Sequence, residues 1–280
     1  MCDGELLSRF EPTTRDTDVF CVTAAKCGQT WLLATLHHLR TRGRDPNYGG
    51  VGLGGVTPWL ELPKSFARDE PFDRDARLAT FDALEDPRVF KMHVLWEEIP
   101  RPPGSRSKVI TITRDPRDLP WSMYSHLRGM RPEIRAASVE DGFDAYFESW
   151  MEFGYFFKFV QSFWPHRDDP DLLWLRFEDL KRDLRAEAEK IVAWAGWDLA
   201  PTDIDRALQW VDFAHMQAQE RTSLMTEARN IWQDDARFFR EGAVGANRAR
   251  LSPDQEARIV SRARETFEPA CLEWVMSQGL

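Results

Sequence analysis

Hydrophobic residues along the 280-residue chain fall into two alternating patterns. Short runs of β-branched and aromatic residues, typical of strands buried in a parallel sheet, occupy residues 19–23, 88–94, 108–113 and 172–177. Between and after these runs, apolar residues recur every three or four positions, which is the spacing of one buried helix face. The alternation predicts an α/β fold in a single domain spanning residues 1–280, with a central, mainly parallel sheet and helices on both sides.

Longer helical patterns and clusters of glycine and proline predict the remaining elements. Residues 1–17 are polar and are expected to form a short lead-in. Pro58-Trp59-Leu60 is expected to begin a short helix. The predicted loops are 43–58 and 238–245, and the predicted helices are 75–86, an aromatic stretch at 139–164 interrupted at Gly154, one helix from Glu178 to Trp194 ended by Gly196, and most of the chain after Pro201.

The first strand leads through a tight loop into a helix. The loop contains Lys26 and Gly28, and the apolar helix face begins at Trp31. Unpaired N–H groups and the positive end of the helix dipole attract anions at such a loop, and the lysine adds a full charge. The lysine precedes the glycine, however, so the Walker pattern is absent. Taken alone, the segment leaves a phosphate-binding loop and an ordinary structural turn equally open.

Arg114 repeats this arrangement at the end of another strand. It follows residues 108–113, and a helix is predicted from Trp121 to Leu127. Because the carboxyl ends of parallel strands share one edge of a sheet, where ligands bind, Lys26 and Arg114 are expected on the same edge. Pairing of Arg114 with Asp118 is the structural alternative.

Composition limits the classes of partner. The net charge of −9 gives no expectation of a broad basic surface for nucleic acid. No apolar run approaches membrane-spanning length and the N-terminus lacks a signal-peptide pattern, so a cytoplasmic protein with no membrane partner is expected. The cysteines show no metal-ligand spacing, which predicts reduced thiols and no metal; they are Cys2, Cys21, Cys27 and Cys271.

Several segments, in the correct order, resemble motifs of the cytosolic-type sulfotransferases. These enzymes use the donor 3′-phosphoadenosine 5′-phosphosulfate (PAPS) and release 3′-phosphoadenosine 5′-phosphate (PAP). The first loop is similar to the family's Tyr-Pro-Lys-Ser-Gly-Thr-Thr-Trp, and Lys91-Met92-His93 is similar to its Lys-Thr-His. The other matches are Arg114 with Ser122 eight residues later, Phe177-Glu178-Asp179-Leu180, Thr222-Ser223-Leu224 and Arg240-Glu241-Gly242. The similarity extends from Asp18 to about Gln255 and implies a P-loop-kinase-like sulfotransferase fold.

The resemblance also implies a role for each matching residue. The loop would bind the 5′-phosphosulfate, and Trp31 would stack on the adenine. Residues 177, 222 and 224 would border the nucleotide. The implied phosphosulfate ligands are Lys26, Cys27, Gly28, Gln29 and Thr30; the implied 3′-phosphate ligands are Arg114, Ser122, Arg240, Glu241 and Gly242; and the bordering residues are Phe177, Thr222 and Leu224.

Four positions depart from the family pattern. Cys27 and Gln29 replace hydroxyl residues, and a glutamine still donates an N–H whereas a thiol donates poorly. Phe177 lacks the hydroxyl of the family's tyrosine. Glu241 replaces a lysine and brings a negative charge toward a phosphate. These changes predict weaker donor binding than is usual for the family.

Sulfuryl transfer requires in-line geometry and stabilised charge on the leaving group. Lys26 can stabilise that charge, and His93 can accept the proton of the acceptor. Lys91 shares a strand face with His93 and can also reach the transferred group. The other histidines are expected to be structural; they are His37, His38, His126, His166 and His215.

Two further function classes stay open from the residues alone. One is a nucleotide-dependent kinase of the same fold, and the other is a non-catalytic nucleotide-binding protein. The acceptor is expected to be a small molecule carrying a hydroxyl or an amine, apolar or aromatic because Trp59, Phe66 and Trp96 lie near the loops 43–66 and 128–138. Both a monomer and a homodimer are compatible with the sequence.

Overall fold

The four described strands form one parallel sheet. The computed structural model describes residues 3–62, 72–135, 137–220, 231–233, 235–240 and 242–276. The strand order is β2-β1-β3-β4. The strands are β1 (Val19–Val22), β2 (Val89–Met92), β3 (Lys108–Thr113) and β4 (Leu172–Arg176). All four predicted strands are confirmed to within two residues at each end, and so is the parallel arrangement.

The register of the sheet brings the carboxyl ends of the strands to one edge. Val22 pairs with Met92 across β1 and β2, and Thr113 pairs with Arg176 across β3 and β4. Every residue of β1 is buried, as the continuous apolar run requires of a central parallel strand. The residue that follows each strand therefore emerges at the same edge.

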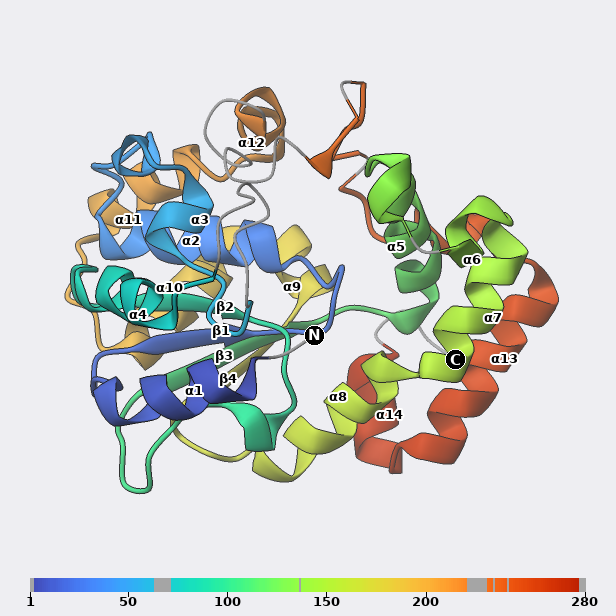
Figure 1. Cartoon of the computed structure of the whole chain (residues 1–280), viewed down its shortest axis with the longest axis horizontal. Coiled ribbons are helices and arrows are strands. Elements are labelled where there is room, and N and C mark those ends of the chain that lie inside the picture. The colour runs from blue at the N-terminus through green and yellow to red at the C-terminus, as the bar shows by residue number, and fades with distance from the viewer. Residues whose placement is uncertain are drawn as a thin grey trace.

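Helices cover both faces of the sheet (Figure 1). On one face, α2 (Gln29–Arg40) packs against β1, β2 and α11 (Pro201–Gln209), and α10 (Leu184–Ala195) packs against β4. The other face carries α1 (Gly4–Phe10) and α8 (Tyr155–Phe163), where Phe163 contacts Trp174 of β4. This arrangement confirms the predicted α/β fold class.

A second group of helices lies beside the sheet, on the right in Figure 1. The interruption predicted at Gly154 is confirmed: this residue has φ 58° and separates α7 from α8. The group comprises α5 (Leu119–Arg128), α6 (Ala137–Glu140), α7 (Phe143–Phe153), α13 (Pro253–Thr266) and α14 (Pro269–Val275).

The remaining α-helices are α3 (Leu53–Val56), α4 (Arg74–Asp82), α9 (Phe177–Arg182) and α12 (Phe213–Ala218). None of the helices in the described ranges is both long enough and apolar enough to cross a membrane.

Three predictions about the amino-terminal part of the chain are wrong. Residues 1–17 contain α1, which buries Leu6, Leu7 and Phe10, so the polar average of this segment concealed one apolar helix face. Residues 58–60 do not begin a helix: Trp59 forms a parallel bridge with Lys91 and extends the sheet past β2. The glycine-rich segment before it is not all loop either, because it contains α3 and a short 3₁₀ helix at Tyr48–Gly50.

The single helix predicted from residue 178 to 194 is two helices. α9 ends at Arg182, and Asp183 then adopts a non-helical conformation and accepts a hydrogen bond from the N–H of Ala186 as the N-cap of α10. The helix end at Gly196, with φ 69°, is as predicted. An aspartate inside an apolar helical pattern was the available signal for the break.

A buried ion pair joins the amino ends of β1 and β2. The guanidinium of Arg88 donates to both carboxylate oxygens of Asp18, at 2.7 and 2.6 Å, and both side chains are fully buried. The rings of Phe10 and Phe90 flank the guanidinium at 5.3 and 5.2 Å. This pair lies at the sheet edge opposite the site described next.

Candidate active site

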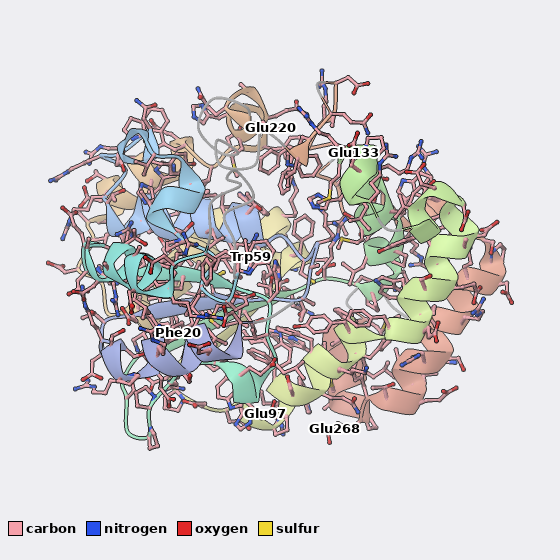
Figure 2. All side chains as sticks on the ribbon, viewed as in Figure 1. Phe20, Trp59, Glu97, Glu133, Glu220 and Glu268 are labelled. Atoms are coloured by element: carbon pink, nitrogen blue, oxygen red, sulfur yellow. The ribbon has the colours of Figure 1, made fainter. Side chains whose placement is uncertain are left out.

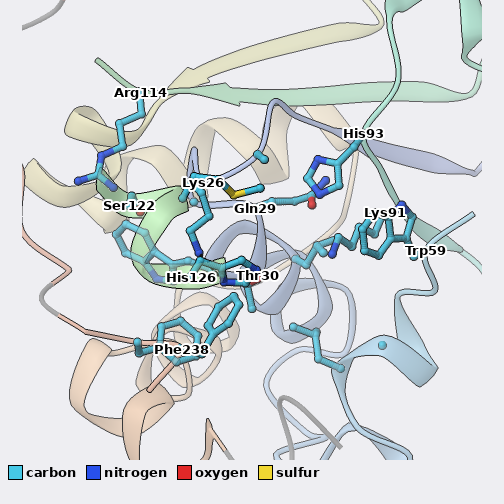
Figure 3. Close-up of a pocket in the computed structure, with 18 of the residues that line it drawn as sticks. Lys26, Gln29, Thr30, Trp59, Lys91, His93, Arg114, Ser122, His126 and Phe238 are labelled. Carbon is cyan, nitrogen blue, oxygen red and sulfur yellow. Dashed lines mark hydrogen bonds between the residues drawn. The ribbon is translucent and has the colours of Figure 1, made fainter. Parts of the chain in front are cut away.

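A cavity of about 660 Å³ opens at the carboxyl edge of the sheet. The loops that follow all four strands contribute to its wall, through Lys26, His93, Arg114 and Phe177. Helices α2 and α5 also contribute, as do residues of the later part of the chain such as Trp232 and Arg240. Its size is typical of small-molecule sites, and Figure 3 shows the charged residues gathered around it.

The β1–α2 loop turns tightly because two residues adopt positive φ. Lys26 has φ 69° and Gly28 has φ 104°. A Cβ atom on Gly28 would lie 2.8 Å from the ring of Phe177, so only glycine fits both the conformation and the space. The loop thus brings the first turn of α2, with its unpaired N–H groups, to the cavity.

Lys26 extends from this loop toward α5. Its Nζ lies 3.1 Å from Nδ1 of His126 and 4.6 Å from the centre of the Phe238 ring. Figure 3 shows the three side chains together below the loop. The ring of His126 in turn contacts Trp232 and Phe238, at 4.7 and 5.4 Å between ring centres.

His93 is held at three points. Its backbone N–H donates to Oε1 of Glu61 at 2.6 Å, its carbonyl accepts from the hydroxyl of Tyr155 at 2.8 Å, and its ring Nδ1 lies 2.7 Å from the carbonyl of Thr23. Because only an N–H can donate to a carbonyl oxygen, Nδ1 carries the proton. Nε2 is then the nitrogen with a lone pair, as a proton acceptor requires.

Lys91 and His93 both line the cavity, as expected from their shared strand face. The ammonium group of Lys91 lies 3.8 Å from the centre of the Trp59 ring, which the bridge at the sheet edge places beside it. Trp59 lies near the middle of the molecule, as Figure 2 shows.

Arg114 and Ser122 lie at the other end of the cavity, as Figure 3 shows, and Arg240 also lines the cavity. Arg114 makes the ion pair with Asp118 that the structural alternative predicted, at 3.0 Å, and still lines the cavity. Phe177 packs 4.5 Å from its guanidinium. Arg240 donates to the carbonyl of Ser122 at 3.4 Å, which ties the 231–242 segment to α5.

Burial and the clustered cations lower the pKa values of Lys26, His93 and His126. Burial, followed by the charges of Arg240, Arg114 and Lys91, lowers the pKa of Lys26 to about 7. Burial and the charge of Lys91 lower the pKa of His93 to about 3. Burial and the charge of Lys26 hold the pKa of His126 well below its ordinary value. The cavity therefore favours anions and neutral histidines.

Two loop residues point away from the role expected of them. Both amide hydrogens of Gln29 serve backbone carbonyls, those of Cys21 and Met92 at 2.9 and 2.8 Å, so this side chain fastens β1 to β2. Cys27 is buried, and its burial raises the pKa of its thiol to about 12, which excludes a reactive thiolate. The tryptophan of the loop motif, Trp31, lines the cavity and donates its indole N–H to the carbonyl of Val211.

The structure gathers most of the remaining candidates in one place. Trp96 is an exception, because it stacks on His166 away from the cavity. Thr222, Leu224, Glu241 and Phe66 lie outside the described residues. The candidates that line the cavity are Lys26, Gly28, Gln29, Thr30, Trp31, Lys91, His93, Arg114, Ser122, Phe177, Arg240 and Gly242.

Sequence analysis missed three residues that shape the site. His126 was assigned a structural role, and the structure places it in the cavity wall beside Lys26. It lies four residues after Ser122 on α5, so helical spacing from a motif residue was an available signal. Glu61 and Tyr155, which hold His93, carried no sequence signal of their own.

Comparison with known proteins identifies the family. The sequence matches the profile of the family described as "Sulfotransferase domain" over residues 16–269. The chain belongs to the sulfotransferase family. It is 26% identical to human Sulfotransferase 2A1 over 238 residues, which cover 85% of this chain and 79% of that protein. It is a sulfotransferase enzyme, and the cavity lies where the matched segments meet.

Solved structures agree with the sulfotransferase fold. Mouse sulfotransferase SULT7A1, solved with PAP, superposes with a TM-score of 0.73 at 21% identity and covers 99% of this chain and 95% of its own. Retinol dehydratase, solved with retinol and PAP, superposes with a TM-score of 0.71 at 19% identity and covers 91% of this chain and 82% of its own. The parallel sheet and helical layers of this chain are thus arranged as in these two solved structures.

Proposed function

We propose that this sulfotransferase, acting as one domain over residues 1–280, transfers a sulfuryl group from PAPS to a hydroxyl or an amine of a small acceptor and releases PAP. The observation that carries the proposal is the gathering of cations and a neutral histidine around one cavity at the carboxyl edge of the sheet. The cations assigned to the donor and the reaction are Lys26, Lys91, Arg114 and Arg240, and the histidine assigned as the base is His93. PAP in two solved structures of the same fold supports the choice of nucleotide.

The positions of the cations indicate where each anionic end of PAPS would bind. Lys26 and the first turn of α2 form the phosphosulfate end, where unpaired N–H groups and an ammonium converge. Arg114 and Arg240, with Ser122 between them, form a second anion site that suits the 3′-phosphate. Two separate anion sites match PAPS, whose ribose carries a phosphosulfate at the 5′ position and a phosphate at the 3′ position.

The reaction moves one group and one proton. The acceptor oxygen or nitrogen attacks sulfur as the bond between sulfur and the bridging oxygen of the donor breaks, and PAP leaves with that electron pair. Nε2 of His93 accepts the acceptor's proton, and the ammonium group of Lys26 stabilises the charge on the leaving oxygen.

Donor binding also prepares the base. The pKa of His93 is about 3 in the empty cavity, partly because of the charges of Lys91 and Lys26. A bound phosphosulfate offsets those charges and so raises the pKa of His93 toward its ordinary range. His93 therefore becomes an effective proton acceptor only once the donor is in place.

The acceptor is proposed to be apolar or aromatic. The acceptor end of the cavity is lined by Leu53, Trp59, Met130 and Tyr155, with the exposed side chain of Phe153 at its margin. Aromatic side chains of this kind bury flat apolar molecules well. A screen in which only highly charged sugars are sulfated would contradict this part of the proposal.

The proposal is tested by titration calorimetry with PAP. Wild type should bind PAP without a metal ion, and Arg114→Ala should bind it at least tenfold more weakly because a charge-assisted bond is lost. The exposed Arg264→Ala is the matched control and should bind PAP as wild type does.

A second step tests catalysis separately. His93→Ala should bind PAP normally yet lose transfer from PAPS to a phenol by about a hundredfold or more. Binding of ATP with Mg²⁺ in preference to PAP would point to a kinase instead. Normal PAP binding without any transfer across a broad acceptor screen would point to a non-catalytic role.

A further inference from the structure

His126 is placed beside the lysine of the phosphate loop without being part of that loop. It lies on α5, a hundred residues away in sequence, and its Nδ1 faces Nζ of Lys26 at 3.1 Å. The ring is fixed between Trp232 and Phe238. A ring held in this way keeps its nitrogen pointing at the ammonium group.

The protonation states make this contact a hydrogen bond from lysine to histidine. The pKa of His126 is well below its ordinary value, so the ring is neutral near pH 7. With a pKa of about 7, Lys26 is charged in roughly half of the molecules at pH 7. In that charged form the lysine has no acceptor, so Nζ donates and Nδ1 accepts, which leaves the ring proton on Nε2. The other described contact of the ammonium group is the face of Phe238 at 4.6 Å. Both partners are uncharged.

We propose that His126 is the resting-state partner of Lys26: it holds the ammonium group while the donor site is empty, gives it up when the phosphosulfate binds, and takes it back when PAP leaves. This inference rests on the proposed function. A doubly charged anion attracts an ammonium group more strongly than a neutral imidazole does, so the exchange is downhill when the nucleotide binds.

The proposed exchange fixes the direction in which loss of this hydrogen bond changes the affinity for PAP. A hydrogen bond that exists only in the free protein opposes ligand binding, because it must be broken first. Its removal should therefore tighten PAP binding, whereas loss of a residue that contacts the nucleotide weakens it. The same bond favours PAP release, because it stabilises Lys26 in the product-free state. His126 is thus a positioning residue that acts through Lys26.

Two substitutions separate the nitrogen from the ring. His126→Phe keeps a flat ring against Trp232 and Phe238 but removes the acceptor nitrogen. His126→Asn loses the ring but keeps an acceptor at a similar distance from the helix. His166→Phe is the matched control, since His166 stacks on Trp96 outside the cavity.

The expected result is a split between these variants in PAP titrations at pH 7. His126→Phe should bind PAP roughly three- to tenfold more tightly and release it correspondingly more slowly in stopped-flow displacement, which is the effect of one hydrogen bond. His126→Asn and His166→Phe should stay within about twofold of wild type. Unchanged or weaker binding by folded His126→Phe overturns the inference, and so does a gain shared by His126→Asn.

The wild-type protein supplies a test that needs no substitution. In a ¹⁵N spectrum of histidine side chains, the Nδ1 resonance of His126 should move on addition of PAP toward the position of an imidazole nitrogen without a hydrogen bond. A resonance that stays in place overturns the inference even where the variants fail to fold. Failure of wild type to bind PAP at all would instead refute the proposed function.

Discussion

PAP binding should take up a proton, and Lys26 should be the group that accepts it. Burial and three neighbouring cations lower the pKa of this lysine from 10.5 to about 7 in the empty site. At that pKa roughly half of the Lys26 side chains are neutral at pH 7, and about nine tenths are neutral at pH 8. A bound phosphate close to Nζ favours the charged form and raises the pKa again, by about 1–3 units.

The magnitude of the uptake follows from these two states. With a pKa of about 7 for Lys26 in the free protein, binding takes up at most about 0.9 proton at pH 8, 0.5 at pH 7 and 0.1 at pH 6, the values reached when Lys26 is fully charged in the complex. The sign is fixed because the free protein binds fewer protons than the complex. PAP affinity should therefore fall as pH rises above 7, by at most about tenfold per pH unit, until the bound lysine also titrates.

Calorimetry in two buffers of different ionisation enthalpy measures this uptake directly. Measurement at pH 8 is the most diagnostic, because a phosphate monoester is fully ionised there. His93 and His126, whose pKa values are lowered further, stay neutral at that pH. Lys26→Arg is the control, because a guanidinium remains charged and cannot take up a proton. Absence of uptake by wild type at pH 8, or equal uptake by Lys26→Arg, would refute the assignment.

Three further substitutions test the frame around the site. Asp18→Ala should lower the free energy of unfolding by about 3–5 kcal/mol in urea titrations, because it leaves Arg88 as an uncompensated buried charge; a loss below 1 kcal/mol would contradict this. Gly28→Ala should abolish PAP binding, since a Cβ atom at φ 104° would lie 2.8 Å from an aromatic ring of α9. Tyr155→Phe should slow transfer several-fold with unchanged PAP affinity, because it frees the carbonyl of His93; an equal loss of PAP affinity would argue against it.

The sheet was predictable because its signals are local. Residues 108–113 are a run of β-branched residues after one lysine, and β3 has these same bounds. Parallel strands share a carboxyl edge, so the placement of Lys26 and Arg114 in one cavity also followed from the predicted parallel sheet. The errors about α1 and about the break between α9 and α10 arose where the local signal was weak within its segment. The apolar face of α1 lies in a polar segment, and the break before α10 depends on the single residue Asp183.

The supports of the site were not predictable in the same way. Glu61 and Tyr155 reach His93 from a sheet bridge and from α8, and their meeting depends on packing between distant elements. Gln29 was expected to donate a hydrogen bond to the phosphosulfate. Instead, both of its amide hydrogens bind backbone carbonyls of the adjacent strands β1 and β2. The residue type determines whether a side chain can donate a hydrogen bond, and the fold determines which acceptors lie within its reach.

The arrangement of charges links the stability of this sulfotransferase to its ligand. Arg240, Arg114 and Lys91 all disfavour the charged form of Lys26, so the empty site keeps like charges close together. Such repulsion destabilises the folded state, and an anion that binds only the folded state relieves it. At a PAP concentration one hundred times the dissociation constant, binding adds about 2.7 kcal/mol to the free energy of unfolding. A site built to bind two anionic groups is thus least stable when empty, and the neutral contacts of Lys26 with His126 and Phe238 limit that cost until the nucleotide arrives.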